Sequence, residues 1–266
     1  MSMKRIFLTI LLLFTTYSAQ AGNIDIILSG GAAFSRLSNN QKVTVDELIA
    51  NRYSVSNSLP PDSIPITNQY DTHQSWQTGP LAGIGIGHTL EQIFNQPLSL
   101  SLNLIAYYVD LGQVKGLEYP FYAGNPDTLN YRFNAESYAL MFTPRLILTA
   151  YSWQPFIFAG IGVAQNRLFD FSETATNPAA NIGTIPTRFG NQNVYAFAYQ
   201  MGIGIQHQIY HDTKRKIQYI ASVDYRYMNF GKGQLNTAPT QTTDHHLKVT
   251  DLSAQAAVLS LNMRFG

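Results

Sequence analysis

The chain has 266 residues, of which 12% are charged and 12% are aromatic, and its formal net charge is +1. Soluble domains carry about 25% charged residues, so this composition favours an outer surface that faces something other than water. The small net charge excludes a strong attraction for nucleic acid. The absence of cysteine excludes disulfides, thiol chemistry and cysteine-bound metals.

The N-terminal residues have the features of a secretory signal peptide. Lys4 and Arg5 precede the apolar stretch IFLTILLLF, which is too short to span a bilayer as a helix, and Ala19–Gln20–Ala21 matches a cleavage site. We therefore expect residues 1–21 to be removed on export and residues 22–266 to form one domain. Removal of two of the 17 basic residues leaves 15 against 16 acidic ones. No later apolar run is long enough for a spanning helix, so the exported chain is predicted to be either soluble or a β-barrel.

The segment PLSLSLNLIAYYVD, which begins at Pro97, alternates apolar and polar residues. This period is typical of a strand with two different faces and is incompatible with an amphipathic helix. Its apolar face runs from Leu98 to Tyr108, which is the length that a tilted strand needs to cross a bilayer, roughly 9–11 residues. The segment predicts one membrane-spanning strand.

The same alternation predicts seven further strands, with outward apolar residues such as Ile84, Phe142 and Ile203. The eight predicted strands are Ile24–Phe34, Gln77–Leu90, Pro97–Asp110, Tyr131–Thr149, Gln154–Asn166, Tyr195–Ile209, Ile217–Phe230 and Thr250–Phe265.

The connections between these strands alternate strictly in length. The short ones are residues 91–96, 150–153 and 210–216, and the long polar ones are residues 35–76, 113–130, 167–194 and 231–249. Short periplasmic turns and long external loops are typical of bacterial outer-membrane barrels. The predicted fold is therefore all-β, an eight-stranded antiparallel transmembrane β-barrel with four long extracellular loops.

Glycine alternates with larger residues in LAGIGIGHTL, FAGIGVAQN and QMGIGIQHQ. These evenly spaced glycines do not fit the G-x-G-x-x-G pattern of a dinucleotide site, so no cofactor is expected. Strand parity places them in the lumen, which is barely wide enough for side chains in an eight-stranded barrel. We expect them to leave room for large side chains from facing strands. They are Gly83, Gly85, Gly160, Gly162, Gly202 and Gly204.

Parity also predicts where charged and aromatic residues lie. Asp25 starts the first strand and Arg264 ends the last, so we expect them to pair across the seam that closes the barrel. The charged residues predicted to point inward are Asp25, Arg145, Asp224, Arg226 and Arg264. Aromatic girdles are expected at both membrane interfaces, with Tyr151, Trp153, Tyr210 and Phe265 at the periplasmic side and Trp76, Tyr108, Tyr195 and Tyr227 at the outer side.

Three clusters could carry chemistry, and each has a plainer interpretation. His207 faces outward but has no serine or acidic residue placed beside it, which favours an interfacial histidine. His245 and His246 are adjacent, so on an extended chain they point in opposite directions and make poor partners for one metal. Lys214–Lys216 is interpreted as a solvated periplasmic turn, although phosphate headgroups could pair with it. The sequence therefore predicts no catalytic, cofactor-binding or metal-binding residues and no enzyme.

Several segments resemble a known family of membrane barrels. VDYRYMNFGKG, PFIFAGIGVA and YAFAYQMGIGIQ resemble strands of OmpA-like and opacity-type outer-membrane barrels, and LSLNMRF resembles their C-terminal assembly signal. Two departures are Gly266 after the final aromatic residue and Ser260 where that signal often has glycine. The resemblance implies an eight-stranded barrel in the bacterial outer membrane, in contact with lipids that include lipopolysaccharide, and says little about activity.

Three functions remain open on the sequence. The first is a structural or adhesion-type protein, expected to be a monomer, that offers loops 35–76, 113–130, 167–194 and 231–249 to an extracellular host or matrix ligand. The alternative is a narrow porin for water, ions or small solutes. A lipid-modifying outer-membrane enzyme ranks third.

Overall fold

The computed structural model describes residues 23–37, 41–45, 66–73, 75–93, 96–119, 128–176, 189–237 and 246–266. The predicted signal peptide, His245 and parts of all four predicted loops lie outside these residues. Within the described part of the chain, no helix is both long and apolar enough to cross a membrane.

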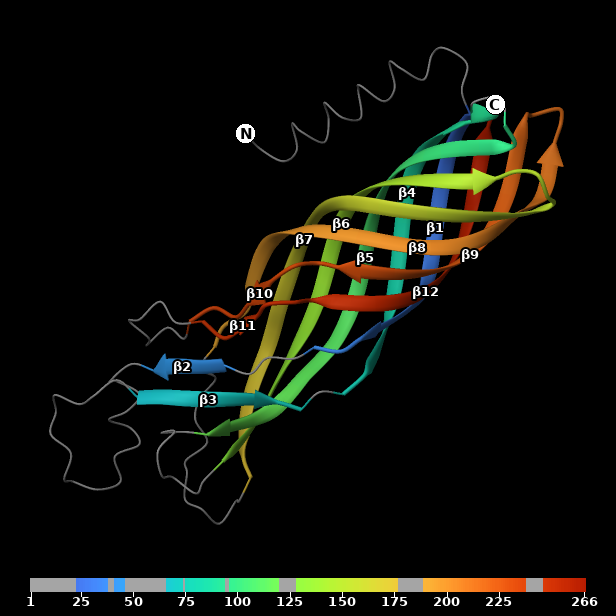
Figure 1. The fold of residues 1–266 in the computed structure, drawn as a ribbon. Helices are drawn as coiled ribbons and strands as arrows, with labels where there is room; N and C mark the ends of the chain where they lie inside the picture. Colours follow the sequence, from blue (N-terminus) through green and yellow to red (C-terminus); the bar gives the residue numbers. More distant parts are fainter. Residues whose placement is uncertain are drawn as a thin grey trace, which may run out of the picture.

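Antiparallel strands close into a barrel, as predicted (Figure 1). β5 pairs with β6 to complete the ring, and β1 pairs with β12 at the seam, where Ile24 lies opposite Phe265. In ring order, the eight strands are β1 (Asn23–Ser35), β4 (Gln77–Leu90), β5 (Leu98–Tyr119), β6 (Leu129–Leu148), β7 (Trp153–Ala175), β8 (Gln192–Asp212), β9 (Ile217–Asn229) and β12 (Ser253–Phe265).

The two ends of the barrel differ. One end carries the short connections 91–97, 149–152 and 213–216 together with Gly266, and we name it the turn end. The opposite end, which we name the loop end, carries four further strands. β2 (Gln41–Val45) and β3 (Ile66–Thr72) extend the sheet beside β5, and β10 (Gly233–Gln234) pairs with β11 (Lys248–Val249).

Three strands, β5, β7 and β8, are much longer than the sequence analysis predicted, whereas β6 matches its predicted range to within two residues at each end. β5, β6, β7 and β8 have 22, 20, 23 and 21 residues, about twice the roughly 9–11 needed to cross a bilayer. The predicted loops 113–130 and 167–194 are thus partly strand, because β5 continues to Tyr119, β7 to Ala175 and β8 starts at Gln192. Predicted loops 35–76 and 231–249 were also wrong as plain loops, since they contain β2 with β3 and β10 with β11.

The outer surface nearer the turn end is a continuous apolar band. All the outward residues predicted for it do face outward, and Ile84, Ile203 and Leu259 are 60%, 64% and 68% exposed. The predicted girdles flank this band, with exposed Trp153 and Tyr210 on one side and exposed Trp76 and Tyr195 on the other. An apolar belt between two aromatic girdles is the surface of a membrane-spanning barrel.

The glycines face inward, but their large neighbours do not come from facing strands as predicted. Phe158 lies over Gly202 and Phe156 over Gly204, and each pair is directly opposed on the adjacent strands β7 and β8. A Cβ atom at either glycine would overlap the ring. The alternating glycines therefore let aromatic rings lie flat against the next strand of the same wall.

Candidate functional site

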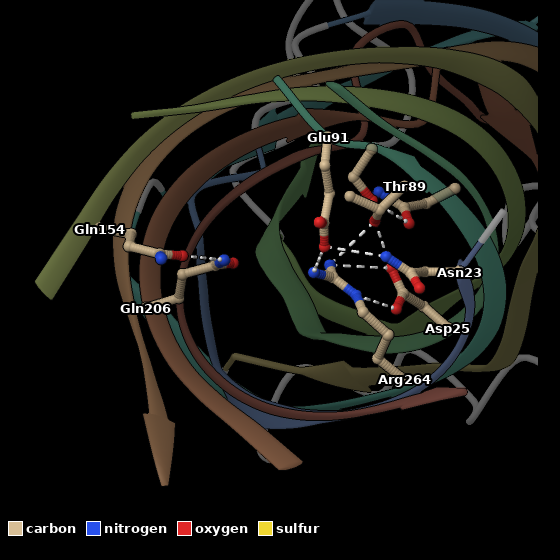
Figure 2. Close-up of polar contacts among 9 residues, drawn as sticks. Asn23, Asp25, Thr89, Glu91, Gln154, Gln206 and Arg264 are labelled. Atoms are coloured by element: carbon tan, nitrogen blue, oxygen red, sulfur yellow. Dashed lines mark hydrogen bonds and ion pairs between the residues drawn. The ribbon is translucent and has the colours of Figure 1, made fainter. Parts of the chain in front are cut away.

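The seam of the barrel carries the predicted ion pair at the turn end (Figure 2). The Arg264 Nε and Nη2 atoms donate to the two Asp25 oxygens at 2.8 and 3.3 Å. Thr89 donates to Asp25 at 2.5 Å and accepts from Arg264 at 2.9 Å. Glu91 lies 3.5 Å from Arg264 and accepts from Asn23 at 2.8 Å. These contacts tie β1, β4 and β12 together, and they confirm the pairing of Asp25 with Arg264.

A second polar pair lies on the opposite side of the interior at the same end (Figure 2). The Gln206 amide donates to the Gln154 side-chain oxygen at 3.0 Å, which joins β8 to β7. The barrel mouth at the turn end is therefore lined by polar side chains on both sides.

Further inside, Asp224 and Arg226 form a buried bidentate pair. The Arg226 Nε and Nη2 atoms donate to the Asp224 oxygens at 2.6 and 2.7 Å, and Nη1 donates to the Tyr107 hydroxyl oxygen at 2.6 Å. Both charged side chains are at most 3% exposed. The fork-to-fork geometry and the tyrosine contact satisfy charges that would otherwise be costly to bury.

Arg145 points inward as predicted but does not join this pair. No ion pair links it to Asp224 among the described residues, and its guanidinium carbon lies 4.2 Å from the centre of the Phe156 ring. Its Nε atom is buried without a hydrogen-bond partner.

The interior of the loop end has the opposite character, because it is an apolar core. Five rings pack at centroid distances of 5.0–6.4 Å in edge-on, tilted and stacked contacts. Aliphatic residues from β5, β7 and the β10–β11 region complete the same buried cluster. This cluster continues along the barrel interior, and we name its loop-end part the loop-end core, which includes Tyr70, Tyr131, Phe133, Phe171, Phe189, Leu111, Leu168, Leu235, Leu247 and Leu252.

Asn166 fixes the chain after β9 inside the mouth of the loop end. Its side-chain amide donates to the carbonyls of Phe230 and Lys232 at 2.7 and 2.8 Å, and its oxygen accepts from Ser137 at 2.8 Å. Asn166 is fully buried, so each of these bonds replaces a lost contact with water. The described residues that follow β9, among them Phe230 and Lys232, are thereby held at the mouth of the barrel.

Polar groups at the edge of the loop-end core are also bonded. Glu118 accepts from Asn68 at 2.6 Å and from the Tyr70 hydroxyl at 3.0 Å, and Thr72 lies 3.0 Å from the Tyr131 hydroxyl. On β6 the apolar band ends at Tyr138, so Tyr131 lies beyond the membrane-spanning part. Burial raises the pKa of Tyr131 to about 12.

The clusters that the sequence analysis set aside occupy separate places. His207 stacks on Trp153 at 4.7 Å between ring centres, and its Nδ1 atom lies 2.9 Å from the Ser152 carbonyl at the turn-end interface. The Nδ1 atom of His246 lies 2.8 Å from the Leu235 carbonyl, so this residue belongs to the folded mouth and not to a solvated loop. Arg215 is exposed in the turn, 4.0 Å from Asp212. Within the described ranges, no three histidine, aspartate or glutamate residues are grouped to hold a metal.

The sequence analysis missed the loop-end core, although a signal for it was present. Beyond the apolar band the alternation continues with its polarity reversed, so that Val114, Phe133 and Phe171 point inward while Lys115 and Arg132 point outward. The predicted ranges of β5 and β7 ended where the outward residues ceased to be apolar, whereas the predicted fourth strand already contained Phe133.

Comparisons with known proteins assign the chain to no family. No family model matches the chain, and no curated protein matches it. Among solved structures, it is similar to Neisserial surface protein A, with 11% identity over 91% of this chain and 96% of that one and a TM-score of 0.34. It is also similar to the outer membrane protein OprG of Pseudomonas aeruginosa, with 14% identity over 92% and 96% and a TM-score of 0.36. The outer membrane protease OmpT of Escherichia coli matches with 7% identity over 93% and 97% and a TM-score of 0.27. Scores of this size carry no argument about function.

Proposed function

We propose that this chain is an integral outer-membrane protein whose barrel is closed to solutes and whose loop end is a folded platform for contact with an extracellular partner. The observation that carries the proposal is the loop-end core. Tyr131, Phe133 and Leu168 are at most 1% exposed inside a part of the barrel whose outer surface is polar. This arrangement is that of a small soluble domain standing on a membrane anchor.

The proposed orientation follows from the lengths of the connections. Barrels of the bacterial outer membrane keep short turns in the periplasm and longer segments outside, which places the loop end outside the cell. Protease added to intact cells is expected to cut within the predicted loops 35–76 or 167–194 and to spare the Lys214–Lys216 turn. Cleavage in the basic turn by protease outside the cell would show that the protein has the opposite orientation.

The platform can be tested by adhesion of whole cells. A strain that displays the protein is expected to bind surfaces coated with laminin, fibronectin or collagen better than the same strain without it. Replacing residues 46–65 and 177–188 by short glycine-serine linkers, which leaves every described barrel strand intact, should abolish the difference. Equal binding by both strains on every surface would contradict the proposal.

The narrow porin remains the alternative because the turn-end interior is polar. The loop-end core blocks that path, since packed apolar side chains leave no continuous polar route through the barrel. The refolded protein in planar bilayers is therefore expected to show no stable single-channel conductance. A large and stable conductance would put the porin first.

A further inference from the structure

The charges inside the turn-end half of the barrel do not balance. Two carboxylates are buried in this half, Asp25 and Asp224. Asp25 accepts hydrogen bonds from two nitrogen atoms of Arg264, and Asp224 accepts hydrogen bonds from two nitrogen atoms of Arg226. Arg145 brings a third guanidinium group into the same interior and is 4% exposed. Among the described buried groups of this half, three cations therefore meet two anions, and the half-exposed Glu91 at the mouth pairs with Arg264 and not with Arg145.

Arg145 carries the excess charge. Within the described part of the chain, its guanidinium makes no hydrogen bond or ion pair, and its contacts are with Phe156 and Phe158, at 4.2 and 6.0 Å from the ring centres. Arginine stays protonated when it is buried. A buried guanidinium without an ion-pair partner costs more than a cation–π contact returns, so the position favours a bound anion.

The glycine motif builds the surface on which Arg145 rests. Gly204 and Gly202 let Phe156 and Phe158 lie against β8, where any Cβ atom would displace the rings. The rings then sit beneath the Arg145 guanidinium on the same wall of the barrel. The alternating glycines, which do not form a nucleotide-binding loop, therefore position the aromatic rings that contact the Arg145 guanidinium.

Other polar atoms in the same half have unused hydrogen-bonding capacity. The Ser222 hydroxyl on β9 is buried without a partner, and so is the Asn262 side-chain oxygen on β12, which is an acceptor and cannot bind an anion. The Ser222 hydroxyl can donate to an anion, as the Arg145 fork can. We infer that Arg145 is the centre of a binding site for a small oxyanion, a phosphate or a carboxylate, inside the barrel.

The ligand has one direction of approach. The loop-end core closes the far side of the interior, so an anion must come from the turn end. There the Arg264 cluster and the Gln154–Gln206 pair lie on opposite sides (Figure 2), and among the residues that the structure describes no hydrogen bond or ion pair joins them across the mouth. An eight-stranded barrel has room for one small ligand at most, which excludes a nucleotide or a whole lipid headgroup. The site is independent of the platform proposed for the loop end.

The test uses the full protein refolded in an uncharged detergent, so that no lipid phosphate is present. Sodium phosphate, and in a second arm sodium acetate, replaces sodium chloride at constant ionic strength. We expect the Arg145 Nε–H resonance to shift and saturate. We also expect the folded-to-unfolded ratio in urea to rise about tenfold for each tenfold increase of the anion above its Kd.

Three variants locate the effect. Arg145→Gln should abolish the response of the urea midpoint, and Arg145→Lys should weaken it because an ammonium lacks the planar fork. Arg132→Gln removes an exposed arginine of the outer surface, whose Nε atom donates to Ser172 at 2.9 Å, and should leave the response unchanged. An unmoved Arg145 resonance in the unaltered protein, or an equal phosphate response in Arg145→Gln, would overturn the inference. The resonance titration decides the matter even if Arg145→Gln does not refold.

Discussion

The two halves of the barrel are built on the same strands with opposite polarity. On β7 the outward residues from Trp153 to Val163 are apolar, and the next outward residues, Gln165 and Arg167, are polar. Over the same crossing, the inward residues change from Gly160 and Gly162 to Leu168 and Phe171. Inward and outward residues therefore alternate along the whole strand, but the outward residues suit lipid in the turn-end half and water in the loop-end half.

The difference shows which interactions stabilise each half. In the loop-end half, burial of apolar side chains contributes about 25 cal/mol per Å² removed from water. In the turn-end half, the outward apolar side chains face lipid, and the interior combines buried apolar residues such as Phe156 with ion pairs and hydrogen bonds, so removal of one partner leaves a buried charge. Substitutions that separate these two cases are the most informative.

The largest effect is expected from emptying the loop-end core. Phe133 is fully buried, stacks on Tyr131 and packs at a tilt against Phe171, so Phe133→Ala should lower the free energy of unfolding by about 3–5 kcal/mol. The matched control is Phe169→Ala, since Phe169 faces outward in the same half against Arg167, and its cost should stay below about 1 kcal/mol. Urea unfolding in detergent micelles measures both, and equal costs would refute a packed core at the loop end.

The second-largest effect tests where the lipid-facing surface ends on β5. Leu102 and Leu117 both face outward on β5, but Leu102 lies within the apolar band and Leu117 beyond it, opposite Asp71 on β3. Leu102→Arg should cost about 2–4 kcal/mol in a refolded bilayer sample. The same change at Leu117 should stay within about 0.5 kcal/mol. A larger cost at Leu117 than at Leu102 would show that the membrane surrounds the loop-end half and not the turn-end half.

The smallest effect is a dependence on alkaline pH confined to the loop-end half. Burial is the main cause that raises the pKa of Tyr131 from 10.0 to about 12, against the hydrogen bond with Thr72, which lowers it. A pKa raised in the folded state gives stability that is complete below pH 10 and lost as the pH rises through 12. The loop-end core should loosen in that window, and Tyr131→Phe should remove this part of the loss.

The two tryptophans of the chain, Trp76 and Trp153, allow this loss to be located. Trp76 lies at the girdle nearer the loop end and Trp153 at the turn end, so Trp153→Phe leaves a reporter beside the loop-end half. In that background, the fluorescence change between pH 10 and 12 should be smaller with Tyr131→Phe than with Tyr131. Identical profiles would show that Tyr131 does not limit the stability of this core.

The sequence predicted the part of the fold in which local pattern and environment agree. The alternation at Leu98–Tyr108 identified the face of β5, and the ends of the chain were enough to predict that Asp25 meets Arg264. The loop-end core depends on contacts between distant segments, such as Asn166 with Phe230 and Lys232, which no local pattern contains. The sequence also could not predict that Arg145 lacks an ion-pair partner, because parity gives the direction of a side chain but not which arginine Asp224 will bind.

The reversal of polarity along β7 is the central claim, and spin labelling tests it most directly. The chain has no cysteine, so single cysteines can be placed at outward positions 157, 159, 161, 163, 165, 167, 172 and 174 and labelled in a refolded bilayer sample. We predict that collisions with oxygen, which partitions into lipid, dominate up to Val163, and that collisions with a water-soluble nickel chelate dominate from Gln165 onward. Oxygen-dominated labels as far as Thr174, or labels in water along the whole strand, would contradict a membrane anchor that carries a separate, water-exposed core.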